Sequence, residues 1–93
     1  MKESDFQRAV LDLARLRQWL PYYTWASMHS PSGFPDLTLV RGERIVFAEL
    51  KVKAKVTEWQ RMWLSTLART GKCQVFLWTP DCWPQIERVL DIL

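Results

Sequence analysis

Residues 33–51 read GFPDLTLVRGERIVFAELK, and this stretch decides the fold. Apolar and β-branched residues over 35–40 and 44–53 predict two strands. Between them, Gly42-Glu43 forms a two-residue loop in which glycine supplies the positive φ that a type II′ turn needs at its first central position. The stretch therefore predicts a β-hairpin whose register is set by its turn.

An acidic residue lies near the far end of each predicted strand. In the register set by the turn, Asp36 faces Glu49, and Lys51 lies on the same face because strand side chains alternate. Two opposed carboxylates repel each other, and a hard divalent cation such as Mg²⁺ relieves that repulsion. This constellation indicates metal-assisted phosphodiester hydrolysis. The alternative is that the acids meet solvent or a nearby lysine, and a register shift of one residue would separate them.

Helices and further strands are predicted around the hairpin. The pairs Ser4–Gln7 and Thr57–Gln60 have the spacing of capping boxes, which begin helices, whereas Pro21 and Gly71 end them. In chain order the predicted elements are a helix over 4–20, a strand over 22–28, the hairpin, a helix from Thr57 to Gly71, a strand over 74–78 and a helix over 84–93.

The hairpin is apolar on both faces, which predicts a sheet covered by helices on both sides. The sequence thus predicts a single α/β domain over residues 1–93 with the order α-β-β-β-α-β-α. Of the tryptophans, Trp63 or Trp78 is expected in the core. Two helices should pack through apolar stripes. In the helix from Thr57 to Gly71 the stripe is Trp59, Met62, Trp63 and Leu67, and in the helix over 84–93 it is Ile86, Val89, Leu90 and Leu93.

Composition narrows the class of protein. Lys and Arg number 13 against 10 Asp and Glu, a formal charge of +3 that permits contact with phosphates without demonstrating it. Cys73 and Cys82 have no partners at zinc-binding spacing, and no apolar run resembles a signal segment or a membrane span. The sequence therefore predicts a cytoplasmic protein with reduced thiols and no membrane partner.

The ordered motifs resemble the PD-(D/E)xK nuclease superfamily, in which P-D is followed at a distance by E-x-K. Here twelve residues separate Asp36 from Glu49. The fuller pattern resembles the VRR-NUC branch, and the resemblance implies a restriction-endonuclease-like core with a mixed four-stranded sheet flanked by helices. The matching motifs are E-x-x-x-Q (Glu3, Gln7), G-x-P-D-L (Gly33 to Leu37), E-L-K (Glu49 to Lys51) and the glutamine Gln60.

The resemblance also implies roles for individual residues. Asp36, Glu49, Lys51 and Gln60 match the catalytic set, and Mg²⁺ or Mn²⁺ is the expected cofactor. The implied metal ligands are Asp36, Glu49, the backbone carbonyl of Leu50 and, from the first helix, Glu3. Two alternatives stay open: Gln60 can simply cap its helix, and Glu3 can be a solvated acid that favours the helix dipole.

Basic residues near the motif predict contact with nucleic acid. Lys53 and Lys55 continue from Lys51, and Lys53 should share its face, so these lysines are expected to bind phosphates without reading sequence. The chain departs from the family in the short segment 29–32, where relatives carry a longer, often basic loop. His29 could supply part of that contact or be a plain surface histidine.

The resulting hypothesis is a Mg²⁺- or Mn²⁺-dependent, structure-selective endonuclease that acts on branched DNA such as four-way junctions. The resemblance further implies a homodimer and an origin in the cytoplasm of a bacterial or phage-infected cell. Two alternatives remain open. One is a nuclease without structural preference, and the other is a catalytically silent nucleic-acid-binding module of the same fold.

Overall fold

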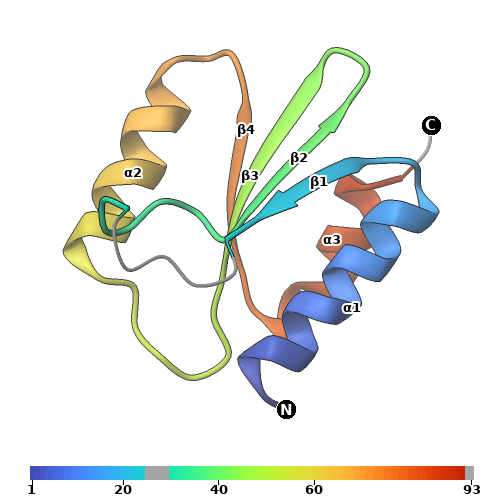
Figure 1. Ribbon diagram of the computed structural model, residues 1–93, viewed down its shortest axis with the longest axis horizontal. Helices are drawn as coiled ribbons and strands as arrows, with labels where there is room; N and C mark the ends of the chain where they lie inside the picture. Colours follow the sequence, from blue (N-terminus) through green and yellow to red (C-terminus); the bar gives the residue numbers. More distant parts are fainter. Residues whose placement is uncertain (25–29, 92–93) are drawn as a thin grey trace.

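The helices and strands follow the expected order α-β-β-β-α-β-α, in a computed structural model that describes residues 1–24 and 30–91 (Figure 1). A short 3₁₀ helix, η1 (Pro80–Cys82), precedes the last α-helix. The helices are α1 (Glu3–Leu16), α2 (Glu58–Arg69) and α3 (Trp83–Val89). The strands are β1 (Leu20–Tyr23), β2 (Leu37–Arg41), β3 (Arg44–Leu50) and β4 (Gln74–Trp78).

The strands form one mixed sheet in the order β1-β2-β3-β4, antiparallel except for the parallel pair β3–β4. The hairpin register is the one that the turn predicts, with Thr38 opposite Phe47 and Arg41 opposite Arg44. Gly42 has φ +59° and Glu43 does not have a positive φ, as a type II′ turn requires. The turn therefore sets the register of the central strands, and with it the residues that meet at their far end.

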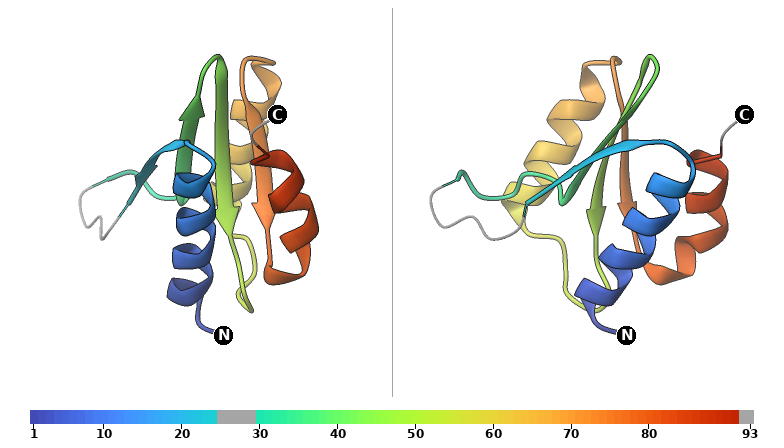
Figure 2. Two further views of the ribbon diagram at one scale, coloured as in Figure 1. Left: turned by 90° about the vertical axis from the view of Figure 1, so that its right-hand side faces the viewer. Right: turned by 45° about the vertical axis from the view of Figure 1, so that its right-hand side comes forward.

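Helices cover both sides of the sheet, α1 and α3 on one side and α2 on the other (Figures 1 and 2). The core lies between the sheet and the α1–α3 layer. Trp78 lies in it and is fully buried, as expected for one of the two tryptophans. The other core residues are Phe6, Val10, Leu11 and Ala14 of α1, Trp19, Leu37, Leu39, Val46, Ala48 and Leu50 of the sheet side, and Ile86 and Leu90.

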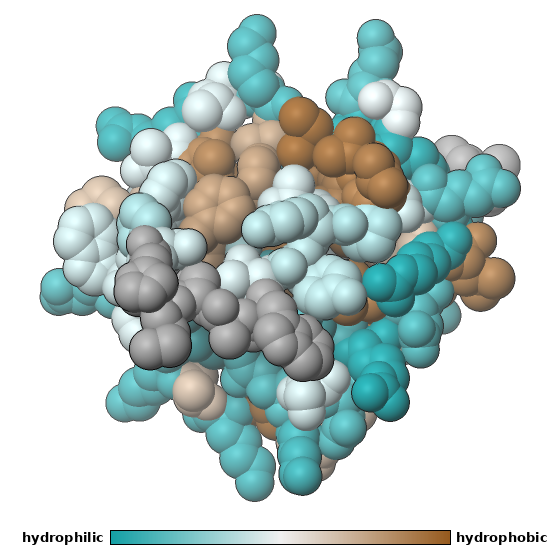
Figure 3. Space-filling model, in the orientation of Figure 1, coloured by the Kyte–Doolittle hydropathy of each residue, from teal (hydrophilic) through white to brown (hydrophobic). Residues whose placement is uncertain are grey.

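The opposite face of the sheet is only partly covered. No residue of α2 is buried, so the expectation of a buried apolar stripe on this helix is wrong. Trp59 and Met62 are exposed, and Trp63 is only half-buried. Beyond α2, hydrophobic side chains gather at the surface over the strands (Figure 3). The exposed apolar residues of the strands on this face are Leu20, Tyr22, Val40, Ile45 and Leu77.

The first helix begins and ends earlier than the sequence predicts. Its N-cap is Lys2, whose amide donates to the Asp5 carboxylate at 3.2 Å, so the Ser4–Gln7 capping box is wrong. It ends at Leu16 because Gln18 adopts φ +68°, which breaks the helical path well before Pro21. The next strand accordingly starts at Leu20, and the later part of the predicted strand, 25–28, lies outside the described residues.

The boundaries of the later elements agree better with expectation. Thr57 caps α2 through the predicted capping box: its hydroxyl accepts the Gln60 amide at 3.2 Å, and its amide donates to the Gln60 side chain at 2.9 Å. Gly71, with φ +66°, follows the end of this helix. Leu93 lies outside the described residues. Within the described part of the chain, no helix is long and apolar enough to cross a membrane.

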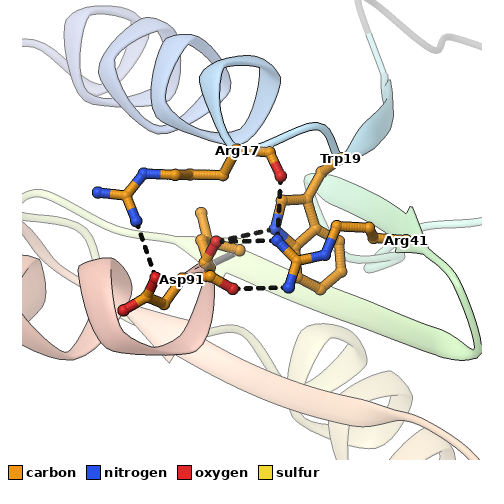
Figure 4. A network of polar contacts seen from close by, with 5 residues as sticks. Arg17, Trp19, Arg41 and Asp91 are labelled. Atoms are coloured by element: carbon orange, nitrogen blue, oxygen red, sulfur yellow. Dashed lines mark hydrogen bonds and ion pairs between the residues drawn. The ribbon is translucent and has the colours of Figure 1, made fainter. Parts of the chain in front are cut away.

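A polar clamp joins α1, the hairpin and the end of α3 (Figure 4). The Arg41 guanidinium donates to the carbonyl oxygens of Arg17 at 3.0 Å and Asp91 at 2.6 Å, with a longer contact to that of Leu90 at 3.4 Å. The Trp19 indole also donates to the Leu90 carbonyl at 3.1 Å, and Arg17 pairs with Asp91 at 3.3 Å. Arg41 thus satisfies carbonyl groups at the ends of two helices.

Replacing Arg41 tests this clamp. We expect Arg41→Ala to lower the free energy of unfolding by about 2–3 kcal/mol, because charge-assisted bonds to half-buried carbonyls are lost. Arg44→Ala is the matched control. Both guanidinium groups lie 4.8 Å from the Trp19 ring, but Arg44 donates only to the exposed Gln74 side chain. Urea denaturation should show a loss below about 1 kcal/mol for Arg44→Ala. Equal losses would assign the effect to stacking on Trp19.

Candidate active site

The two carboxylates of the motif meet at the end of the hairpin opposite its turn. Strand pairing stops at Leu37 and Ala48, so Asp36 stands one residue before β2 rather than inside the ladder. Its carboxylate reaches across and accepts the Leu50 amide at 2.8 Å. Asp36 is half-buried and follows the fully buried Pro35, which fixes the backbone at this point. Its negative charge lies close enough to raise the pKa of Glu49.

Glu49 is the buried carboxylate of the site, with 1% of its surface exposed. Its Oε2 atom accepts a hydrogen bond from the Gln60 side chain at 3.0 Å and lies 3.5 Å from the Lys51 amine. The Oε1 atom is buried and has no hydrogen-bond partner among the residues that the structure describes. Burial and, second, the charge of Asp36 raise the pKa of Glu49 from 4.5 to about 8, against a smaller lowering by Lys51.

Lys51 follows β3 directly, and its amide donates to the Trp78 carbonyl at 2.9 Å. Its amine points back to Glu49, as the alternation of the strand predicts. The strand predicted over 44–53 ends earlier, at Leu50. The expectation that Lys53 shares a face with Lys51 relied on strand alternation, which does not continue to residue 53. Lys53 and Lys55 are exposed in the irregular segment before α2.

Gln60 both caps its helix and contacts the buried Glu49. Its side-chain oxygen accepts the Thr57 amide at 2.9 Å, which completes the capping box of α2. Its side-chain nitrogen donates to Glu49 at 3.0 Å. Because one amide group makes both bonds, the cap fixes the side chain in the orientation that holds the buried carboxylate. The start of α2 is therefore tied to the end of β3.

Gly33 is a positioning residue whose structural reason the sequence did not reveal. Its φ is +94°, and a Cβ atom at this position would lie 2.5 Å from the carbonyl carbon of Trp59 and 2.8 Å from the amide nitrogen of Gln60. Only glycine allows the loop before Asp36 to touch the first turn of α2 in this conformation. The G-x-P-D motif therefore sets the distance between Asp36 and Gln60. Its glycine was the feature of the sequence that could have indicated this close contact.

One of the predicted site residues, Glu3, is not brought to the carboxylates. Glu3 is exposed at the first residue of α1, and within the described part of the chain no three His, Cys, Asp or Glu side chains gather as a metal-binding group. Glu3 therefore does not join Asp36 and Glu49 in this structure. His29 lies outside the described residues.

The donors that are brought together fit a hard divalent cation. The carboxylates of Asp36 and Glu49 supply oxygen atoms only, which is the preference of Mg²⁺. The partnerless Oε1 of Glu49 is a buried acceptor whose desolvation is uncompensated in the protein alone. A cation at this place would satisfy that atom and offset the repulsion that raises the pKa of Glu49.

Comparison with solved structures finds the same fold in a VRR_NUC domain protein. The two chains superpose with a TM-score of 0.67 at 20% sequence identity, and the match covers 98% of this chain and 92% of that chain. The fold class expected from the motifs, a mixed four-stranded sheet flanked by helices in a restriction-endonuclease-like core, is confirmed. No family model matches the chain, and no curated protein matches it by sequence.

The raised pKa of Glu49 predicts how stability depends on pH in the metal-free protein. The unfolded chain loses the Glu49 proton near pH 4.5, whereas the folded protein keeps it up to about pH 8. Folding therefore takes up a proton in this window. Stability that is present below pH 4.5 is lost as the pH rises toward 8, by on the order of 1 kcal/mol per pH unit.

Urea denaturation in EDTA at pH 5, 6, 7 and 8 measures this dependence. We expect Glu49→Gln, which mimics the protonated side chain, to flatten the fall. Glu43→Gln, at the exposed hairpin turn, removes the same charge and should follow the wild type. A wild-type stability that stays constant or rises over this range would contradict the assigned pKa.

The contact of Gly33 with α2 predicts that alanine destabilises the protein more at position 33 than at position 42. We expect Gly33→Ala to lower the free energy of unfolding by about 2–4 kcal/mol, because the new methyl group collides with main chain and the positive φ is strained. Gly42→Ala is the control: its φ is +59°, but nothing lies within 4 Å of the added Cβ, so about 1 kcal/mol of strain is expected. Equal losses in thermal or urea unfolding would deny the close approach.

Proposed function

We propose that this protein is a metal-dependent nuclease of the VRR-NUC type that hydrolyses phosphodiester bonds in DNA. The observation that carries the proposal is the buried Glu49, held beside Asp36 and Lys51 with one carboxylate oxygen left without a partner. A buried carboxylate beside a second, half-buried one is costly for a domain of this size and serves no packing purpose. The shared fold of the VRR_NUC domain protein supports the same conclusion.

Asp36, Glu49 and the carbonyl of Leu50 would hold Mg²⁺ or Mn²⁺. When bound, such an ion lowers the pKa of a water and stabilises negative charge on the phosphate under attack. Glu49 has to release its proton to become a ligand, so binding should strengthen as the pH rises toward 8. The proposal thus explains the raised pKa: Glu49 holds a proton while no metal is bound and becomes a ligand when it loses that proton.

The remaining side chains orient the reaction. Lys51 is 12% exposed and lies 3.5 Å from Glu49, so its amine can face both the carboxylate and an incoming phosphate. There it would position the attacking water or offset the charge that develops on the phosphate. Gln60 keeps the Glu49 carboxylate in one rotamer through its 3.0 Å bond. These residues supply geometry and charge to the reacting groups.

The substrate that we propose is branched DNA, such as a four-way junction, cut by a homodimer. Lys53 and Lys55 would contact phosphates next to the site, and these contacts read shape and charge rather than sequence. The sheet face with exposed Leu20, Tyr22, Val40 and Ile45 is an apolar surface of the kind that marks association. Two copies would present two sites to two strands.

Cleavage of labelled DNA tests the proposal directly. We expect wild-type protein to cut a four-way junction in Mg²⁺ or Mn²⁺ and not in EDTA, and to cut the matched linear duplex less. Lys51→Ala should lower the rate by about 100- to 1,000-fold, because the positive charge at the reacting phosphate is lost. Lys72→Ala is the control, since Lys72 is exposed beyond α2 at the opposite end of β4 from the site.

Each outcome decides between the alternatives. Equal cutting of junction and duplex would keep the nuclease and reject the structural preference. Binding without cutting in any metal would favour the silent nucleic-acid-binding module. A Lys51→Ala variant that cuts as fast as Lys72→Ala would remove Lys51 from the reaction. Sedimentation of the wild type beside these assays measures the proposed dimer.

A further inference from the structure

A groove lies beside the candidate active site, on the exposed side of α2. Its volume is about 450 Å³, and its walls are mainly apolar. The residues that line it are Pro31, Ser32, Trp59, Met62, Trp63 and Thr66. The four residues from α2 recur at intervals of three and four, so they form one face of the helix. This is the face that the sequence predicted to be buried and that the structure leaves open.

The side chains that line the groove differ in how firmly they are held: Trp63 has fixed partners, whereas Trp59 and Met62 are exposed. The Trp63 indole donates to the Ser32 carbonyl at 3.1 Å, and its ring meets Phe34 edge-on with centroids 5.0 Å apart. By contrast, 61% of Trp59 and 57% of Met62 are exposed. An exposed indole beside a fixed aromatic ring on the same helix face offers a surface on which a flat ring can pack.

The groove lies next to the candidate site. Trp59 lines the groove, and the next residue, Gln60, donates to Glu49. Ser32 also lines the groove, and the next residue, Gly33, touches the main chain of both Trp59 and Gln60. The groove and the carboxylates therefore meet where the loop before Asp36 contacts the first turn of α2.

We propose that this groove binds an unpaired nucleobase of the DNA strand next to the phosphate to be cut, by stacking on Trp59. The proposal rests on the nuclease function above and specifies how the substrate is selected. Every base offers a flat face for stacking, so such contacts tolerate any sequence. In a regular duplex each base face is covered by its neighbours, and only an unpaired or extruded base can enter.

The chemistry of the lining favours a base over other occupants. Ser32 and Thr66 are its polar residues, and the Ser32 carbonyl already accepts the Trp63 indole. The groove therefore suits a ring face rather than the hydrogen-bonding edge of a base, and should not select one base over another. No acidic side chain is among these lining residues to repel the adjoining phosphates. At a branch point the continuous stacking of the duplex is interrupted, so a base beside it costs less to extrude than a base inside a regular duplex.

Binding assays in EDTA separate the groove from the chemistry of cleavage. The probes are a fluorescein-labelled oligothymidylate of about ten nucleotides and a strand of equal length with every base removed. We expect Trp59→Ala to weaken binding of the oligothymidylate about tenfold and to leave the baseless strand unaffected, because only the stacking contact is lost. Trp59→Phe should retain most of the affinity, since it keeps an aromatic face.

Two controls complete the experiment. Leu16→Ala removes an exposed apolar side chain from α1, on the other side of the sheet, and should change neither affinity. Lys72→Ala removes an exposed charge at the opposite end of β4 from the site and should bind both strands within a fewfold of the wild type, since it keeps the groove intact. The unfolding midpoints of the Trp59, Leu16 and Lys72 variants should agree with the wild type, because all three side chains are exposed.

Three results would overturn the proposal: an unchanged affinity of Trp59→Ala for the oligothymidylate, an equal loss on both strands, or dissociation of a wild-type dimer on this substitution. The last would assign the groove to contact between copies of the chain. The groove and the nuclease fail separately. If the wild type cuts DNA but Trp59→Ala binds normally, only the groove proposal is wrong; if the wild type neither binds nor cuts, both are wrong.

Discussion

The arrangement of this small domain depends on one constraint, the burial of the Glu49 carboxyl group. It has 1% exposure, a second carboxylate beside it and a pKa raised to about 8. A protein of this size has little stability to spare for an uncompensated polar group. The surrounding contacts limit the penalty without removing it, since Gln60 and Lys51 both address one oxygen and leave the other free. A buried acid with so strongly perturbed a pKa marks a candidate functional site.

The rest of the structure separates stability from this costly site. The core lies between the sheet and the α1–α3 layer, and the clamp around Arg41 closes the turn end of the hairpin. The carboxylates stand at the other end of the same hairpin, on the face that α2 covers only in part. The Arg41 clamp is therefore remote from the groups that would react, and its contacts help to offset the cost of the buried acid.

The sequence predicted the parts that depend on local rules. The Gly42 turn determines the register of β2 and β3, so the meeting of Asp36 with Glu49 followed from counting residues. The Thr57–Gln60 capping box likewise follows from spacing alone. Tertiary contacts decided what could not be predicted. The stripe of α2 looked like a core face, but whether Trp59 is buried depends on what lies opposite, and here an open groove lies there. The end of α1 depends on the left-handed Gln18, which no residue preference signals.

Gly33 shows why motif and mechanism are connected in this fold. Its close approach to Trp59 and Gln60 brings the loop before Asp36 against the first turn of α2. The same turn is held by the Thr57 cap, whose partner Gln60 bonds Glu49. A shift of this loop would therefore move Asp36 and Gln60 together, changing both neighbours of the buried carboxylate at once. Because the helix that carries Gln60 also carries Trp59, a base stacked in the groove would press on the element that orients Glu49. Substrate binding and the geometry of the site would then be coupled through a single turn of α2.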